Sequence, residues 1–303
     1  MQHVFQVAAR SARRFGSLRE VCYPSSDRLR ATEWETLRVS VEDGVCNLSL
    51  NRPAAANAIN MTMWKELISV FASVDECADV RCVVLRGEGA VWSAGMDLSV
   101  FGEMAAMHAA EPCAARAREA LSRSIDHFQR AISAPEKCRV PVIAAIAGAC
   151  IGGGVDLATA CDLRYAAADG SFCIKETDLA IVADIGTLQR LPKLIGDQMA
   201  RELAYTGRTL GAEEAAALGL TVRTYADRAA LDAGVADVAA AIASKSPITI
   251  RGVKQALVYA RDHSVADSLE QVKLHNAAML HSADLQEAFR AAMARDTPAW
   301  DQR

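Results

Sequence analysis

Three acidic residues lie in surroundings that are unusually apolar or built from small side chains. Asp156 follows three glycines, Glu176 follows a mostly apolar run, and Asp184 lies inside another apolar run. A carboxyl group in such surroundings loses hydration, which raises its pKa and suits it to proton transfer. Each acid also has a purely structural alternative. Asp156 and Asp184 can stabilise helix N-termini, and Glu176 can pair with Lys175 or face solvent.

Two glycine-containing loops could present backbone N–H groups to a developing negative charge. Residues 150–156 join a buried strand to a helix, where free N–H groups and the positive end of the helix dipole lie. Residues 83–97 pass from an apolar strand into a run of small residues. If the loops face one cavity, they form an oxyanion hole with two donors. The alternative is two tight turns that need glycine for packing, and the sequence does not choose between them.

The elements that must position these loops alternate between strands and helices. An Asp-Gly turn predicts a hairpin, and Asn60 can cap the helix that follows it. We expect strands at 37–41, 45–50, 82–85, 140–146 and 163–166, and helices at 60–75, 103–135 and 153–160. This alternation predicts an α/β fold with a largely parallel sheet covered on both faces. After about residue 196 we find only helical signals, at 212–218, 229–243, 249–260, 266–280 and 283–294.

Composition excludes several classes of function. The chain has 303 residues, a net charge of −4 and a pI of about 5.9. Proteins that bind nucleic acids usually have a basic surface, so this acidic composition does not indicate a nucleic-acid partner. The longest apolar run, 140–149, is too short for a membrane span. The nine cysteines form no CxxC pair and no cluster with histidine, so we expect no zinc site and no disulfide framework; we also expect no cofactor, because proton transfer between carboxyl groups and a substrate requires none.

The first thirty residues differ from the rest of the chain. Four arginines precede the first acidic residue, Glu20, and serines lie between them. This composition is typical of a mitochondrial presequence, so we expect residues 1–30 to direct the protein to mitochondria; a disordered basic tail is the alternative. A peroxisomal location is the second choice, although the chain ends without a Ser-Lys-Leu signal.

Several motifs together resemble the crotonase (enoyl-CoA hydratase/isomerase) superfamily in order and spacing. They are Asn51-Arg52-Pro53 and the segments 57–60, 92–98, 141–148 and 152–154. The resemblance implies a crotonase (ClpP/crotonase-like) fold of repeated ββα units at 31–225 and a helical trimerisation region at 226–303. It also implies homo-trimers, which can pair into hexamers, and an acyl-CoA thioester as substrate.

The same resemblance assigns residues to the substrate site. The backbone N–H groups of Met96 and Gly153 would hold the thioester oxygen. The other substrate-binding positions would be Ala94, Gly95, Asp97, Leu98 and Gly152. The chain departs from the family pattern at residues 54–56, which lack a basic residue near the CoA phosphates, and in the last helix, where Arg295 is the only basic residue of the corresponding segment.

The acids indicate the subfamily. Asp156 and Glu176 match the two glutamates of the hydratases, and Asp184 stands where hydratases commonly have glycine. The three acids together resemble the Δ(3,5)-Δ(2,4)-dienoyl-CoA isomerases, which convert 3,5-dienoyl-CoA to 2,4-dienoyl-CoA in β-oxidation. This implies that Glu176 serves C2, Asp184 serves C6 and Asp156 tunes their charges. The alternatives are a 2-enoyl-CoA hydratase and a non-catalytic scaffold or RNA-binding relative.

Overall fold

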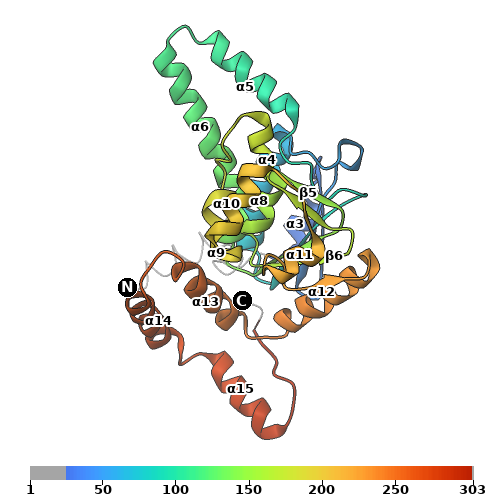
Figure 1. Cartoon of the computed structure of the whole chain (residues 1–303). Helices are drawn as coiled ribbons and strands as arrows, with labels where there is room; N and C mark the ends of the chain where they lie inside the picture. Colours follow the sequence, from blue (N-terminus) through green and yellow to red (C-terminus); the bar gives the residue numbers. More distant parts are fainter. Residues whose placement is uncertain (1–24, 302–303) are drawn as a thin grey trace, which may run out of the picture.

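A six-stranded sheet forms the centre of the molecule (Figure 1). The computed structural model describes residues 25–301. Strands β1 and β2 are antiparallel, and all later neighbours pair in parallel. In spatial order the strands are β1 (Leu37–Glu42), β2 (Val45–Leu50), β3 (Cys82–Gly87), β4 (Val142–Ile146), β6 (Leu163–Ala167) and β9 (Thr224–Tyr225).

Local sequence signals fix the first elements as predicted. Asp43 and Gly44 both have positive φ, 47° and 79°, which is the backbone of a type I′ hairpin turn. The side chain of Asn60 accepts a 3.0 Å hydrogen bond from the Met63 N–H and caps α4 (Met61–Glu76). These two signals place the first strands and helix of the fold.

Helices cover both faces of the sheet. Helix α4 packs Trp64 and Leu67 into the larger core cluster, which also contains Val83 and Leu85 of β3. The intervening residues of β3, Cys82 and Val84, point to the opposite face, where α12 (Arg228–Ala243) packs. The strand is therefore apolar at every position because both of its faces are buried.

A smaller sheet supports the two glycine-containing loops. Its strands are β5 (Ala149–Ile151), β7 (Ser171–Cys173) and β8 (Leu210–Gly211). Strands β8 and β9 correct the expectation of purely helical structure after residue 196. Each has only two residues, which is too short for an alternating pattern to show in the sequence.

The helical segment expected at 103–135 is divided. Helix α5 (Leu98–Ala110) and helix α6 (Ala114–Ile132) form an arm that projects from the body, and the short helix α7 (Ala134–Lys137) follows (Figure 1). The break falls at Glu111, whose extended conformation (φ −93°, ψ 112°) is the one that Pro112 imposes on the residue before it.

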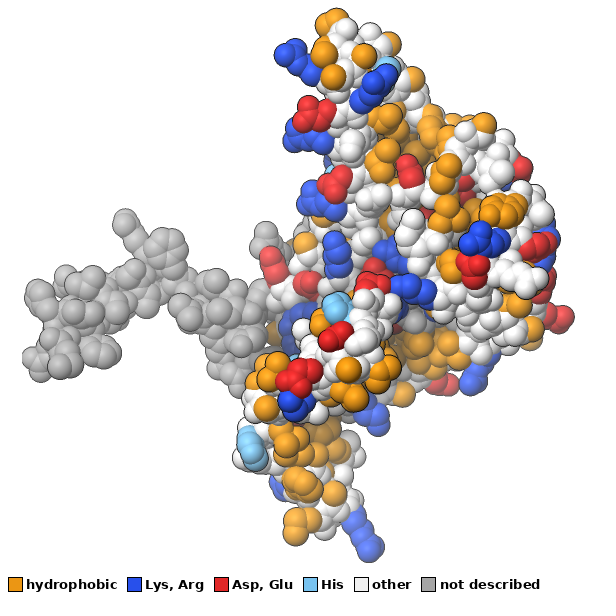
Figure 2. All heavy atoms as spheres, turned by 60° about the vertical axis from the view of Figure 1, so that its left-hand side comes forward, with side chains coloured by type: hydrophobic (Ala, Val, Ile, Leu, Met, Phe, Trp, Pro, Cys, Tyr) orange, Lys and Arg blue, Asp and Glu red, His pale blue; other side chains and the backbone are white. Residues whose placement is uncertain are grey.

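The remaining helices lie around the two sheets and in the C-terminal part of the chain. They are α3 (Asp27–Ala31), η1 (Pro53–Ala55), α8 (Gly153–Ala160), η2 (Glu176–Leu179), α9 (Thr187–Ile195), α10 (Asp197–Thr206), α11 (Ala212–Ala217), α13 (Pro247–Tyr259), α14 (Val265–Met279) and α15 (Ala283–Ala294). Helices α13–α15 extend away from the sheet, and hydrophobic side chains gather on their surface (Figures 1 and 2).

Two expectations concern the ends of the chain and the membrane. The proposed presequence, 1–30, lies outside the described residues except for its last six positions. Within residues 25–301, no helix combines the length and the hydropathy that a membrane span requires.

Candidate active site

A largely apolar cavity of about 720 Å³ opens between the glycine-containing loops, the α5–α6 arm and the segment 175–185. Two of the three candidate acids, Glu176 and Asp184, lie in its wall together with Met96, Gly152 and Gly153. The apolar part of the wall consists of Ala55, Ala58, Ala94, Leu98, Phe101, Met104, Leu121, Ile125, Phe128, Ile151, Leu179, Ile181, Val182 and Ile185. A cavity with a few polar groups in an apolar wall suits a lipid-like ligand.

The two loops lie against each other, which the sequence alone did not show. The Ser93 N–H donates to the Ala149 carbonyl at 3.1 Å, and the Ile151 N–H donates to the Ser93 carbonyl at 2.9 Å. Gly95 has a φ of 83°, and a Cβ atom added to it would lie 2.6 Å from the Ile151 oxygen and 3.0 Å from the Gly153 nitrogen. Gly95 is therefore required by both its backbone conformation and this close approach.

Two backbone N–H groups at this junction are free to bind a ligand. In residues 25–301, neither Met96 nor Gly153 donates its N–H to a protein acceptor. Gly153 is the first residue of α8, where the helix leaves N–H groups unpaired. Both residues line the cavity, so their N–H groups can serve one oxyanion.

Asp156 is fully buried behind the cavity and is not among the residues that line it. Its Oδ1 accepts the N–H of Thr187, the first residue of α9, and its Oδ2 has no partner among the described residues. Burial, and secondarily the charge of Glu176, raises the pKa of Asp156 to about 7. Asp156 thus stabilises the N-terminus of α9 while adding a titrating charge beside the cavity.

Glu176 faces the cavity floor. A Cβ atom added to Gly152 would lie 3.2 Å from its Oε1, and its Oε2 is buried with no hydrogen-bond partner in the described residues. Burial raises the pKa of Glu176, and the nearby Asp184 adds to the shift. Lys175 pairs with Asp178 at 2.5 Å, so the alternative ion pair between Lys175 and Glu176 is not formed.

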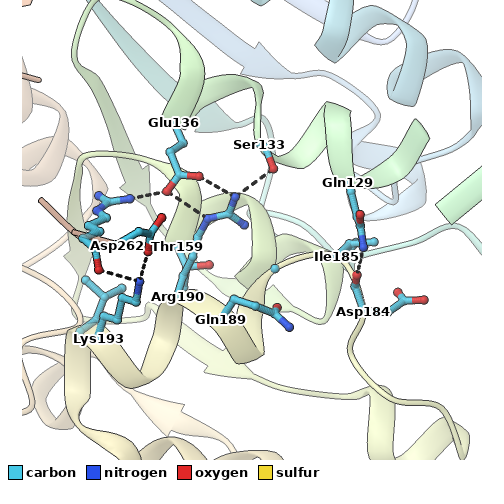
Figure 3. Close-up of a pocket in the computed structure, with 13 residues that line it drawn as sticks. Gln129, Ser133, Glu136, Thr159, Asp184, Ile185, Gln189, Arg190, Lys193 and Asp262 are labelled. Carbon is cyan, nitrogen blue, oxygen red and sulfur yellow. Dashed lines mark hydrogen bonds and ion pairs between the residues drawn. The ribbon is translucent and has the colours of Figure 1, made fainter. Parts of the chain in front are cut away.

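Asp184 separates the apolar cavity from a polar one of about 360 Å³ and lines both. Its carboxylate points away from the polar cluster shown in Figure 3. Burial raises the pKa of Asp184. The first N–H of α9, that of Thr187, is accepted by Asp156 and not by Asp184, so the alternative role of Asp184 as a cap of this helix is wrong.

Side chains that line the polar cavity contact the loop around Asp184 on the side opposite the apolar cavity (Figure 3). Gln129 donates its Nε2 hydrogen to the Asp184 carbonyl at 2.7 Å. Arg190 forms an ion pair with Glu136 at 2.8 Å, and its Nη1 would lie 1.9 Å from a Cβ atom on Gly186. The guanidinium therefore packs where any side chain at position 186 would stand, which fixes the loop.

The predicted substrate-binding segment, Ala94 to Leu98, lies along one side of the cavity. Every residue of it except Gly95 lines the wall, and Arg52 holds the Asp97 carboxylate at 2.8 Å. The hydrogen bond from Arg52 lowers the pKa of Asp97. Among the described residues, Lys175 is the one basic residue in this wall.

Sequence reasoning missed several residues of this site. Gln129 binds the main-chain carbonyl of Asp184 with its side-chain amide, and Thr187 donates its backbone N–H to Asp156, and neither residue's position in the sequence gives a signal of these contacts. The apolar wall residues Leu121, Ile125 and Phe128 repeat at a helical spacing, which gave a detectable signal, but it did not indicate which cavity they face. Residues 25–301 hold no group of three side chains that could bind a metal ion.

Comparisons with known proteins agree on one family. The enoyl-CoA hydratase/isomerase family model matches residues 40–303. The peroxisomal Δ(3,5)-Δ(2,4)-dienoyl-CoA isomerase of Arabidopsis thaliana is 43% identical over 87% of this chain and 95% of its own length. The human mitochondrial Δ(3,5)-Δ(2,4)-dienoyl-CoA isomerase is 44% identical over 85% of this chain and 79% of its own length.

Solved structures show the same fold. A putative enoyl-CoA hydratase from Streptomyces coelicolor superimposes with a TM-score of 0.81 at 28% identity, covering 90% of this chain and 96% of that one. An enoyl-CoA hydratase from Bacillus anthracis has a TM-score of 0.79 at 31% identity, and the match covers 89% of this chain and 100% of that one.

Proposed function

Because this chain belongs to the enoyl-CoA hydratase/isomerase family, we propose that it is an isomerase that converts 3,5-dienoyl-CoA to 2,4-dienoyl-CoA in the β-oxidation of unsaturated fatty acids. The observation that supports this choice most strongly is the position of Asp184. It places a second carboxyl group beside Glu176 in the wall of the apolar cavity. A shift of two conjugated double bonds needs proton transfer at both C2 and C6, and two carboxyl groups can provide it.

The reaction begins at C2. The Glu176 carboxylate takes a proton from C2, and the electron pair of that C–H bond delocalises onto the thioester oxygen, which becomes negative, and through the adjoining diene as far as C6. The N–H groups of Met96 and Gly153 stabilise that oxygen. The protonated Asp184 then gives its proton to C6, which yields the 2,4-diene. Glu176 ends protonated and Asp184 ends ionised, so one proton must return before the next turnover.

The raised pKa values of the acids suit these roles. Burial favours the neutral form of Asp184, which must enter the reaction protonated. The charge of Glu176 raises the pKa of Asp156, and the charge of Asp184 raises the pKa of Glu176. The titrations of the three carboxyl groups are therefore linked through Glu176. Asp156 lies behind the cavity wall and acts by tuning this shared charge.

A 2-enoyl-CoA hydratase is the alternative with a specific observation in its favour. Asp156 and Glu176 are neighbours, as the two acids that activate water would have to be. The hydration reaction, however, has no step that requires Asp184. Asp156 is 0% exposed and does not line the cavity, so it cannot contact a water molecule bound there. The isomerase accounts for all three acids.

The test replaces Asp184 by asparagine, which keeps the size and backbone of the residue but cannot act as an acid. We expect Asp184→Asn to lower turnover of 3,5-dienoyl-CoA by about 10²–10⁴-fold, the range for loss of a general acid. Any hydration of 2-enoyl-CoA should change much less. Asp169→Asn is the matched control, because Asp169 is exposed in the turn between β6 and β7 and lines neither cavity. Near wild-type isomerisation by Asp184→Asn would contradict the proposal.

We also propose a homo-trimer or a hexamer of two trimers. Helices α13–α15 expose large apolar side chains, among them Leu257 at 65%, Val265 at 77% and Phe289 at 62%. An exposed apolar surface of this extent is typical of a subunit interface. Light scattering on the purified chain tests it, and a monomer would contradict it.

A mitochondrial location is consistent with the relatives. The human and mouse relatives are named mitochondrial, and the Arabidopsis thaliana relative is named peroxisomal, which is the alternative location. A reporter fused to residues 1–30 tests the choice, since a peroxisomal or diffuse signal would contradict mitochondrial targeting by this segment.

A further inference from the structure

A second cavity, of about 460 Å³, lies beside the active cavity at the α5–α6 arm. It is bounded by α4, α5 and α6. Its lining residues are Met61, Lys65, Glu103, Met104, Met107, Arg123, Ser124, His127 and Phe128. Within residues 25–301, Met104 and Phe128 are the two residues that line this cavity and the active cavity alike.

Helix α6 explains this arrangement. Leu121, Ile125 and Phe128 follow a helical i, i+4, i+7 spacing and face the active cavity. Ser124 and His127 lie on the adjoining face and line the second cavity. The two cavities therefore adjoin at the arm, where Met104 of α5 and Phe128 of α6 belong to the walls of both.

The two shared side chains differ in mobility. Phe128 is 2% exposed, and its ring centroid lies 4.8 Å from that of Trp64, so the core fixes it. Met104 is half-buried on the projecting arm. Methionine is unbranched and has three rotatable bonds, so its side chain can adjust to the space around it. Met104 is thus the adjustable part of the partition.

We propose that Met104 sets the acyl-chain length that the enzyme accepts, and that the second cavity takes the distal end of a long acyl chain. This inference rests on the proposed acyl-CoA function. The occupant follows from continuity, because the second cavity adjoins the apolar cavity that contains the candidate acids.

The lining of the second cavity suits an alkyl chain. Met61, Met104, Met107 and Phe128 provide apolar contacts. Lys65, Glu103 and Arg123 are exposed, and the stems of such side chains can border an apolar ligand while their charged ends remain in water. Burial lowers the pKa of His127, and the nearby positive charges of Arg130 and Lys65 lower it further, which favours the neutral imidazole. A neutral ring does not exclude an alkyl chain as a charged one would.

The test compares short and long ligands in binding, and it needs no catalysis. We would measure Kd for saturated eight-carbon and sixteen-carbon acyl-CoA with the wild type and with Met104→Ala. We expect Met104→Ala to increase the preference for the long chain at least tenfold. A tenfold change corresponds to about two further methylene groups buried. Isomerisation of 3,5-dienoyl-CoA of both lengths should show the same change in kcat/KM.

Ser124→Phe provides the matched control, because it fills the second cavity without altering the active one. In the Met104→Ala background it should abolish the gain for the long chain. An unchanged length preference in folded Met104→Ala overturns the proposal, and so does a gain that persists in the double variant. Failure of the proposed function looks different: the binding preference would still change, but neither length of 3,5-dienoyl-CoA would be isomerised.

Discussion

The side-chain amide of Gln129 holds the main-chain carbonyl of Asp184 at 2.7 Å, across 55 positions of sequence. Gln129 lies near the end of α6, and Asp184 lies in the loop before α9. The bond comes from the polar cavity, while the Asp184 carboxylate points the other way (Figure 3). Gln129 therefore positions the acid without touching the substrate cavity itself.

This relationship predicts the effect of Gln129→Leu. The variant keeps a side chain of similar size but loses the donor, so the loop should sample other positions and the proton donor should be misplaced at C6. We expect kcat to fall about tenfold or more, since small misplacements of catalytic groups have large effects. KM should change little. Ser122→Ala, on an exposed part of the same helix, is the control. A rise in KM together with the fall in kcat, and a lowered melting temperature, would indicate a merely structural role.

The oxyanion hole predicts a loss of rate in Gly153→Pro. Proline is well tolerated at the first position of a helix, which is where Gly153 stands in α8, so the fold should survive. The substitution removes one of the two proposed N–H donors, and such a loss costs roughly 10²–10³ in kcat. Steady-state kinetics and a thermal melt check this together. Nearly normal turnover by a folded variant would remove Gly153 from the mechanism.

Much of the core and of the site follows from local sequence signals. Asn60, the Asp43-Gly44 turn and the glycines before Asp156 each act within a few residues, so they predict the elements that they start or end. The resemblance adds which loops face the substrate. Contacts across long sequence distances are different, because neither periodicity nor spacing reveals them.

Asp156 illustrates what the sequence cannot show. Its position after three glycines suggested an acid near the start of one helix, α8, but its carboxylate accepts the N–H of Thr187 at the start of another, α9. The two residues are 31 positions apart, and only the packing of α8 on α9 brings them together. The two-residue strand β9 was missed for a similar reason, since its pairing with β6 is set by tertiary structure.

Asp156 should make the stability of the protein depend on pH. Its pKa rises from 3.8 in the unfolded chain to about 7 on folding, so the folded state holds this proton more tightly. Stability contributed by the neutral form is complete below pH 3.8 and is lost as pH rises towards 7. Asp156→Asn cannot ionise, while its Oδ1 can still accept the Thr187 N–H.

The stability of Asp156→Asn relative to the wild type should therefore improve between pH 5 and pH 8, by about 2 kcal/mol. Denaturant unfolding of both proteins at the two pH values measures this. Parallel changes in the two proteins would show that Asp156 ionises equally well in the folded and unfolded states, and the proposed charge coupling to Glu176 would lose its support.

Deuterium exchange distinguishes the roles of the two cavity acids. If Glu176 removes the C2 proton, Asp184→Asn in D₂O should still form the dienolate and return it to substrate. Recovered 3,5-dienoyl-CoA should then carry deuterium at C2 although little product forms. Glu176→Gln should show neither exchange nor product, because the first step is blocked. Mass spectrometry and proton NMR of the recovered thioester read out both results. The opposite pattern, with exchange surviving in Glu176→Gln and absent in Asp184→Asn, would assign C2 to Asp184 and C6 to Glu176, since only the acid at C2 is needed for exchange there.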